Sequence, residues 1–194
     1  MGRKLSRAVI SFLDPRTYFQ IVRLLHFYHY THIEPRSKAT LGHDARLAPN
    51  VSLRNGERIS IGARSRIGEH AFLWAGDSSG HITIGADCRF GPGVFVTASD
   101  YGLMPDELIA TQEKNEQDIV IGNDVWLGAN VFVAAGVNIG DGCVVGAGSA
   151  VTRSLPAGSI AVGVPARVVR RREDYAPAAG DKAEATAEAE AATT

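Results

Sequence analysis

A strict period of six residues dominates this chain. Aliphatic residues recur at every sixth position of its second half, at Ile121, Leu127, Val133, Ile139, Val145 and Val151. A helix needs an apolar stripe near 3.6 residues and a half-buried strand needs a period of two, so the pattern fits neither. A fixed longer period is typical of repeat architectures. The sequence therefore predicts a solenoid built from short strands.

The same period extends back to Leu41 and is interrupted regularly. Grouping the blocks in threes gives coils that start at Leu41, Ile61, Ile84, Ile121 and Ile139, and all extra residues then fall in the third block of a coil. We call the apolar residue that begins each six-residue block its opener. The third opener of a coil is followed by Arg54, Trp74, Thr97, Ala134 or Thr152. The first opener is followed by glycine, which we expect to relieve strain at tight corners. This predicts an all-β solenoid of about five three-sided coils, with every insertion at one corner. We expect the chemistry at that corner.

The blocks from Asp118 to Arg172 also carry a family resemblance. The stretch DIVIGNDVWLGANVFVAAGVNIGDGCVVGAGSAVTRSLPAGSIAVGVPARVVRRR resembles the hexapeptide-repeat acyltransferases nearly block for block, and the likeness covers residues 41–171. It is most similar to the sugar O-acetyltransferases of galactoside, maltose, nodulation-factor and colanic-acid type. The resemblance implies a left-handed parallel β-helix, a homotrimer, acetyl-CoA as acyl donor, and a sugar or glycan acceptor in polysaccharide or cell-surface glycan biosynthesis.

Three segments are expected. Residues 1–40 form a basic N-terminal helical segment, residues 41–171 the acyltransferase β-helix, and residues 172–194 a disordered tail rich in alanine and acidic residues. Cys88 and Cys143 occupy inward positions of their blocks, which predicts buried free thiols. We expect a cytoplasmic protein without a signal peptide or membrane span, and the net charge of −1 gives no indication of nucleic-acid binding.

The N-terminal segment is predicted to contain one helix. Asp14 is a suitable N-cap, Pro15 suits the first helical position, and we expect Glu34-Pro35 to end the helix. Its apolar face would pack on the solenoid end or on a neighbouring subunit. Alternatively, residues 1–34 make a peripheral membrane contact, supported by basic and aromatic residues.

Acyl transfer to a hydroxyl needs a base that takes the proton. The resemblance implies a histidine on the loop from Thr97 to Asp118, but its position falls on Ser99 in one alignment and Tyr101 in another. Three explanations stay open. His81 is the base, oriented by Asp100; or Asp100, Tyr101 or a group of a neighbouring subunit serves; or the protein is a non-catalytic trimeric scaffold or CoA-binding protein.

The resemblance also assigns binding residues. For coenzyme A these are Ala129, Ala147, Thr152, Arg153, Arg167 and Arg170. Small side chains admit a thin pantetheine arm, and guanidinium groups suit phosphates. Asp77, Glu69 and Trp126 are candidates for the acceptor.

No metal is expected. His26, His29 and His32 do not share one helical face, so they serve a tetrahedral ion poorly. The γ-type carbonic anhydrases share the implied fold, but the spacing of His43, His70 and His81 does not resemble their motif. An amine acceptor in place of a hydroxyl stays open.

Overall fold

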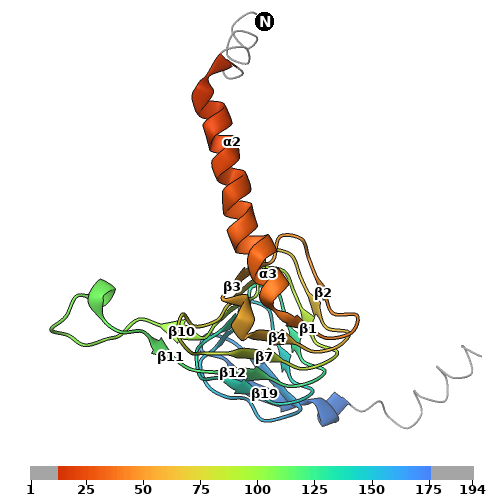
Figure 1. The fold of residues 1–194 in the computed structure, drawn as a ribbon. Coiled ribbons are helices and arrows are strands. Elements are labelled where there is room, and N and C mark those ends of the chain that lie inside the picture. Colours follow the sequence, from red (N-terminus) through yellow and green to blue (C-terminus); the bar gives the residue numbers. More distant parts are fainter. Residues whose placement is uncertain (1–12, 176–194) are drawn as a thin grey trace, which may run out of the picture.

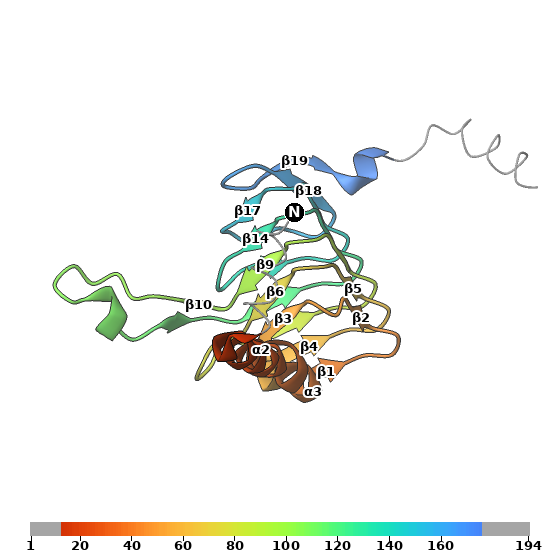
Figure 2. The same cartoon turned by 90° about the horizontal axis from the view of Figure 1, so that it is seen from above.

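The computed structural model describes residues 13–175. A β-solenoid forms the body, a helical segment projects from its first-coil end, and a β-arm projects from its side (Figures 1 and 2). The predicted architecture, a β-solenoid of about five coils with an N-terminal helix, is confirmed.

Three parallel sheets form the three faces of the solenoid. The first face holds β1 (Thr40–Leu41), β4 (Ile59–Ile61), β7 (Ile82–Ile84), β12 (Ile119–Ile121) and β15 (Asn138–Ile139). The second face holds β2 (Arg46–Leu47), β5 (Arg66–Ile67), β8 (Arg89–Phe90), β13 (Trp126–Leu127), β16 (Val144–Val145) and β18 (Ser159–Val162), with β19 (Arg167–Arg171) added antiparallel. The third face holds β3 (Ser52–Arg54), β6 (Phe72–Trp74), β9 (Phe95–Thr97), β14 (Phe132–Val133) and β17 (Ala150–Val151).

The six-residue openers stack in register, as predicted. On the third face, Leu53, Leu73, Val96, Val133 and Val151 are Cα partners from coil to coil. All five point inward and are buried. The period of six therefore places one apolar side chain per face in each coil. It is buried except at Leu41, which is 37% exposed at the open end of the first face. Cys88 and Cys143 are buried free thiols, as expected.

The glycines that follow the first opener of each coil do not have the predicted role of relieving backbone strain at a corner. None of Gly42, Gly62, Gly85, Gly122 and Gly140 has a positive φ. Instead, a Cβ on Gly62 would lie 2.4 Å from the carbonyl carbon of Gly85 in the next coil. These glycines are needed because the coils approach closely, and strain relief at the corner is the wrong explanation. The residues that adopt the left-handed backbone conformation, with positive φ, at this corner include Asp44, Arg64, Asp87 and Asp124.

The N-terminal helix begins as predicted and ends later. Asp14 Oδ1 accepts a hydrogen bond from the Arg16 N–H at 2.9 Å and caps α2 (Pro15–Tyr28). The chain then continues through a π-helical turn η1 (His29–Ile33) into α3 (Glu34–Lys38). Glu34-Pro35 does not end the helical segment, because Pro35 falls in the first turn of α3, where no N–H partner is required.

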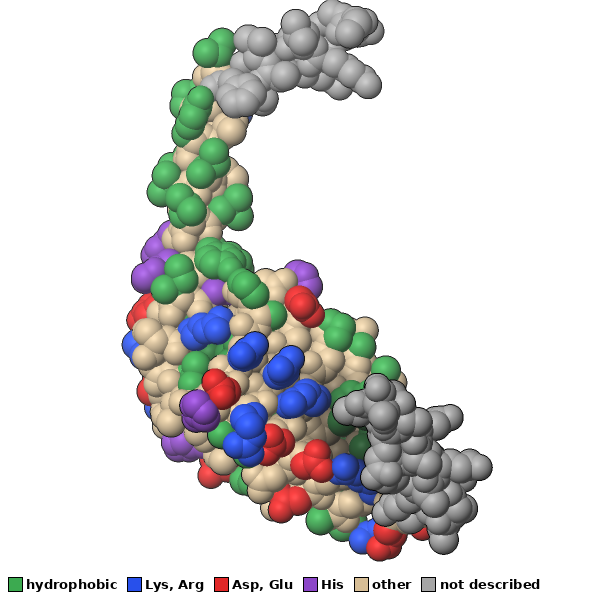
Figure 3. Space-filling view, turned by 90° about the vertical axis from the view of Figure 1, so that its right-hand side faces the viewer, with side chains coloured by type: hydrophobic (Ala, Val, Ile, Leu, Met, Phe, Trp, Pro, Cys, Tyr) green, Lys and Arg blue, Asp and Glu red, His purple; other side chains and the backbone are tan. Residues whose placement is uncertain are grey.

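The predicted packing of the helix on the solenoid end holds only for its last turns. The η1 and α3 turns contact β3, and α3 also contacts η2 (Gly56–Arg58), whereas α2 does not pack on the solenoid. The α2 helix buries no residue, and exposed apolar side chains run along the face of it that Figure 3 shows. Its last residue makes one contact with the solenoid loops, a hydrogen bond of 2.8 Å from the Tyr28 hydroxyl to the Pro49 carbonyl. Only the neighbouring-subunit and lipid alternatives remain for this surface.

The last strand leads into a short 3₁₀ turn, η4 (Arg172–Tyr175). Arg172 Nη1 lies 2.6 Å from Asp124 Oδ2, which fastens this turn to the solenoid. The expected disordered tail therefore does not begin at residue 172. Its remainder, residues 176–194, lies outside the described residues.

Candidate active site at the third corner

The three insertions meet at the corner that follows the third face, as the position of the extra residues predicted. The first coil contributes η2 (Gly56–Arg58) with Asn55, and the second contributes residues 75–81. The third contributes the arm, in which β10 (Ser99–Asp100) pairs antiparallel with β11 (Asn115–Glu116), with η3 (Ile109–Thr111) near its tip. Asn55 Nδ2 donates to the carbonyls of Ala75 and Gly76, which joins the first insertion to the second.

The Glu116 carboxylate joins the second insertion to the arm. It accepts hydrogen bonds from the backbone N–H groups of Asp77, Ser78 and Ser79 at 2.6, 3.1 and 2.6 Å. The hydroxyls of Ser78 and Ser79 add two more, at 2.9 and 3.1 Å. These donors, the Ser79 N–H foremost, lower the pKa of Glu116 to about 2. Glu116 is therefore a fastening group and a poor proton acceptor.

Asp77 is held between two partners. Lys114 Nζ of the arm lies 2.5 Å from Asp77 Oδ2, and Asn55 Nδ2 lies 3.1 Å from Oδ1. The hydrogen bond from Lys114 is the main cause that lowers the pKa of Asp77, and the same bond raises the pKa of Lys114. Asp77 is therefore charged and fixed at the corner.

These contacts frame a cleft of about 320 Å³ between the third face and the base of the arm. Its lining includes Arg54, Trp74, Asp77, Ser99, Asp100, Tyr101 and Lys114. Its volume lies within the range of small-molecule sites, about 300–1,000 Å³. The floor is aromatic: the Trp74 and Phe95 rings meet edge to face at 4.9 Å, and the Arg54 guanidinium lies 4.2 Å from the Trp74 ring centroid.

Three of the proposed catalytic residues line this cleft. Ser99 and Asp100 form β10, and Tyr101 follows, with the Lys114 ammonium 5.7 Å from its ring centroid. Within residues 13–175, no side-chain hydrogen bond or ion pair engages the Asp100 carboxylate. Asp100 is thus the one lining carboxylate of the described chain that is free to accept a proton from a ligand.

His81 lies elsewhere than its proposed role requires. It is not part of the cleft lining, and its side chain is 58% exposed. The carboxylate beside its Nδ1 is Asp118, at 3.4 Å, and not Asp100. Asp118 also accepts the His81 backbone N–H at 2.7 Å, which is the main cause of its lowered pKa. The expected orientation of His81 by Asp100 is therefore wrong.

Three of the six coenzyme A candidates lie along the edge where the second and third faces meet. Ala129 and Ala147 occupy equivalent turns of adjacent coils, where a Cβ on Gly128 would lie 2.6 Å from the Ala147 nitrogen. Gly146 donates to the Ala161 carbonyl in β18, and Arg167 of β19 is the Cα partner of Val162. Ala129, Ala147 and Arg167 therefore lie along one edge towards the end of the solenoid.

The other three candidates lie apart. Thr152 and Arg153 are exposed after β17, at the same corner as the insertions but two coils beyond the arm. Arg170 is exposed on β19, with its guanidinium 5.5 Å from the Tyr175 ring centroid. One chain alone does not gather all six residues.

The acceptor candidates are also divided. Asp77 lines the cleft. Glu69 is exposed at the corner between the second and third faces, and Trp126 is 56% exposed on the second face, in register with Arg89 and Val144. Neither Glu69 nor Trp126 lines the cleft.

Several residues that line the cleft were not predicted from the sequence, and three of them carry a charge or a large aromatic ring next to the candidate residues. Arg54, Trp74 and Lys114 were not site candidates, yet Arg54, Trp74 and Thr97 are Cα partners that all follow a third opener. Since the insertions were already assigned to that corner, this shared position was a usable signal. Nothing in the period marks Lys114, which depends on how the arm folds.

The described residues also bear on whether the chain could bind a metal ion or cross a membrane. Among residues 13–175, no group of three His, Cys, Asp or Glu side chains is placed to hold a metal ion. His32 instead stacks on Tyr28, with ring centroids 4.3 Å apart. No helix within this range has the length and apolar character to cross a bilayer.

Comparison with known proteins adds to this geometry. The bacterial transferase hexapeptide model (six repeats) matches residues 118–153. Galactoside O-acetyltransferase of Escherichia coli (strain K12) is 33% identical over 136 residues, which is 70% of this chain and 65% of that protein. The chain thus spans just under two-thirds of the length of this curated relative.

Two solved structures extend the match. The hexapeptide-repeat acetyltransferase of Vibrio cholerae O1 biovar eltor, complexed with acetyl coenzyme A, is 31% identical with a TM-score of 0.63, covering 71% of this chain and 73% of that one. A galactoside acetyltransferase in complex with coenzyme A is 30% identical with a TM-score of 0.66, covering 84% and 86%.

Proposed function

Because this chain belongs to the hexapeptide-repeat acetyltransferase family, we propose that it transfers the acetyl group of acetyl-CoA to a sugar hydroxyl. The observation that carries this proposal is the match over 84% of the chain to a galactoside acetyltransferase that holds coenzyme A. The cleft at the third corner supports it, because it offers a free carboxylate beside an aromatic floor. The expected setting is polysaccharide or cell-surface glycan biosynthesis.

Asp100 is the general base of this proposal. The sugar oxygen attacks the carbonyl carbon of the thioester while the Asp100 carboxylate takes the hydroxyl proton. The tetrahedral intermediate then expels the sulfur with its bonding electron pair, and protonation gives free coenzyme A and the sugar ester. Asp100 is preferred over His81 because only Asp100 lines the cleft. Ser99, Tyr101 and the fixed carboxylate of Asp77 supply hydrogen-bonding groups to the acceptor.

Arginines near the end of the solenoid suit the phosphates of the donor. Within residues 13–175, Arg153 and Arg167 have no carboxylate within ion-pair distance, whereas Arg171 and Arg172 already pair with Glu173 and Asp124. Unpaired guanidinium groups are suited to phosphate binding. The small Ala129 and Ala147 leave room for a thin arm beside the backbone.

A homotrimer would explain why one chain scatters these residues. Aromatic side chains on the outer side of the third face support self-association. Phe72, Phe95 and Phe132 stand there in register, with Phe72 exposed and the other two half-buried. The uncovered apolar surface of α2 adds a second contact, with a neighbouring subunit or with lipid.

A transfer assay tests this function. The full chain is mixed with acetyl-CoA and a panel of neutral sugars, and thiol release and sugar mass are followed. The proposal predicts acceptor-dependent thiol release with one acetyl group added to a sugar. If no sugar causes thiol release although the chain still binds acetyl-CoA, the result would favour a non-catalytic CoA-binding protein.

A further inference from the structure

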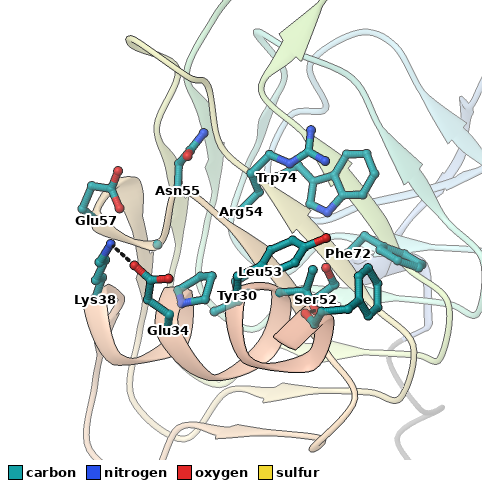
Figure 4. Close-up of a pocket in the computed structure, with 14 residues that line it drawn as sticks. Tyr30, Glu34, Lys38, Ser52, Leu53, Arg54, Asn55, Glu57, Phe72 and Trp74 are labelled. Atoms are coloured by element: carbon teal, nitrogen blue, oxygen red, sulfur yellow. Dashed lines mark hydrogen bonds and ion pairs between the residues drawn. The ribbon is translucent and has the colours of Figure 1, made fainter. Parts of the chain in front are cut away.

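A second and larger cavity adjoins the cleft. It has a volume of about 530 Å³ and lies between the helical segment and the first two coils of the third face (Figure 4). Tyr30 reaches into it from η1, while Ser52, Phe72 and Trp74 enter from β3 and β6. None of the residues proposed above for catalysis or for coenzyme A lines it.

Arg54 and Trp74 form the wall between the cavity and the cleft, because both residues line both spaces. The guanidinium lies 4.2 Å from the Trp74 ring centroid, and Phe72 meets the same ring edge to face at 5.8 Å. A ligand that lies across Trp74 would therefore occupy both spaces.

The charges of the cavity balance. Its lining has two acids, Glu34 and Glu57, and two bases, Lys38 and Arg54. Glu34 and Lys38 pair at 2.7 Å, and Glu57 lies 3.3 Å from Arg58. The formal charges of the lining therefore sum to zero, although Arg54 has no acid partner within residues 13–175 and lies against the Trp74 ring. Such a lining suits a neutral ligand.

The remaining lining combines rings with hydrogen-bonding groups. Phe27, Tyr30, Phe72 and Trp74 present aromatic surface. No hydrogen bond within residues 13–175 engages the side-chain hydroxyls of Ser52 or Tyr30. Apolar surface with a few polar groups is the usual composition of a binding site, and aromatic rings with polar neighbours match a sugar, which has apolar C–H faces and a rim of hydroxyls.

We propose that the acceptor is a neutral oligosaccharide and that this cavity binds the sugar units next to the one in the cleft. The inference rests on the proposed transfer to a sugar, and it names the acceptor as a chain of several units. Tyr30 is a specificity residue here, because the π-helical turn η1 carries it to the edge of the solenoid.

Binding without acyl donor tests the inference. Gluco-, galacto- and manno-oligosaccharides of one to four units are titrated into the full chain by calorimetry. We expect affinity to rise about tenfold from one unit to three for the best series in the wild-type chain. Tyr30→Ala should reduce this rise to about threefold or less. Phe19→Ala, a matched aromatic change on the exposed part of α2, should leave it intact.

Three outcomes would overturn the inference: equal affinity for one and three units, a rise that survives Tyr30→Ala, or no binding by any series. The melting temperature of each variant identifies loss of folding, and Ser52→Leu, which fills the cavity from β3, serves as a second variant. Because no donor is present, a chain that binds oligosaccharides in this way yet transfers no acetyl group would keep the oligosaccharide site in the cavity and refute the transfer reaction.

Discussion

Glu116 Oε2 accepts a hydrogen bond of 2.6 Å from the backbone N–H of Ser79, a residue 37 positions earlier in the chain. This contact joins the second coil's insertion to the base of the arm. The arm carries Asp100 and Lys114, and the insertion carries Asp77. The geometry of the cleft therefore depends on a carboxylate that does not line it.

Removing the charge of Glu116 should loosen this corner. Glu116→Gln keeps the shape of the side chain but replaces one accepting oxygen by an amide donor, which faces backbone N–H groups. We expect the Ser78 and Ser79 amides to exchange hydrogen about tenfold faster, as measured by hydrogen-exchange mass spectrometry. Glu113→Gln, on the same arm, is the control. Equal protection in both variants would contradict the fastening role.

The same contact sets a pH dependence. The pKa of Glu116 is lowered from the ordinary value of 4.5 to about 2. A carboxyl group with a depressed pKa stabilises the fold above its unfolded pKa, and this contribution is lost as pH falls through the folded pKa. The gap in melting temperature between wild type and Glu116→Gln should be constant above about pH 5 and narrow from there towards pH 2. A gap that widens on acidification would refute this assignment.

The arginines near the end of the solenoid should control donor binding. We expect the wild-type chain to bind acetyl-CoA with a Kd on the order of micromolar, equivalent to about −8 kcal/mol. Arg153→Ala/Arg167→Ala should weaken binding at least about tenfold, because each guanidinium would lose a charge-assisted hydrogen bond to phosphate. Calorimetry measures this, with Arg46→Ala on the opposite end of the second face as control. Unchanged affinity in the double variant would remove both residues from the donor site.

Self-association should appear as a solution mass of three chains of 20.6 kDa by light scattering. Val22→Asp/Leu25→Asp distinguishes the two roles left for α2. If α2 packs on a neighbouring subunit, the mass falls. If it lies on lipid, the mass stays and binding to anionic vesicles is lost. A monomeric wild-type chain would contradict the trimer.

Much of the fold could be predicted because residues six positions apart take equivalent inward positions on successive faces, so the period follows directly from how the coils stack. It placed Leu53, Leu73 and Val96 as partners, and it assigned the insertions to one corner. The role of the glycines was missed because the approach between coils, such as Gly62 to Gly85, is a tertiary distance without a local sequence signal.

The site was less predictable for the same kind of reason. Asp100 was a candidate from its position, but its freedom from partners depends on Glu116 and Lys114 having other ones. His81 was assigned to the right corner and the wrong carboxylate, because Asp118 reaches it from the far end of the insertion. The extension of the helical segment past Pro35 could not be predicted from the sequence. A π-helical turn comes before Pro35 and places it in the first turn of α3, whereas the usual expectation is that a proline ends a helix.

The rate of acetyl transfer in Asp100→Asn tests the central claim most directly. Asparagine keeps the shape of the side chain and removes the proton acceptor, so we expect kcat to fall about 100-fold or more with little change in acetyl-CoA binding. Asp106→Asn, an exposed aspartate near the arm tip, should retain wild-type activity. A rate for Asp100→Asn within about threefold of wild type, with a large loss in His81→Ala, would contradict the account and return the role of base to His81.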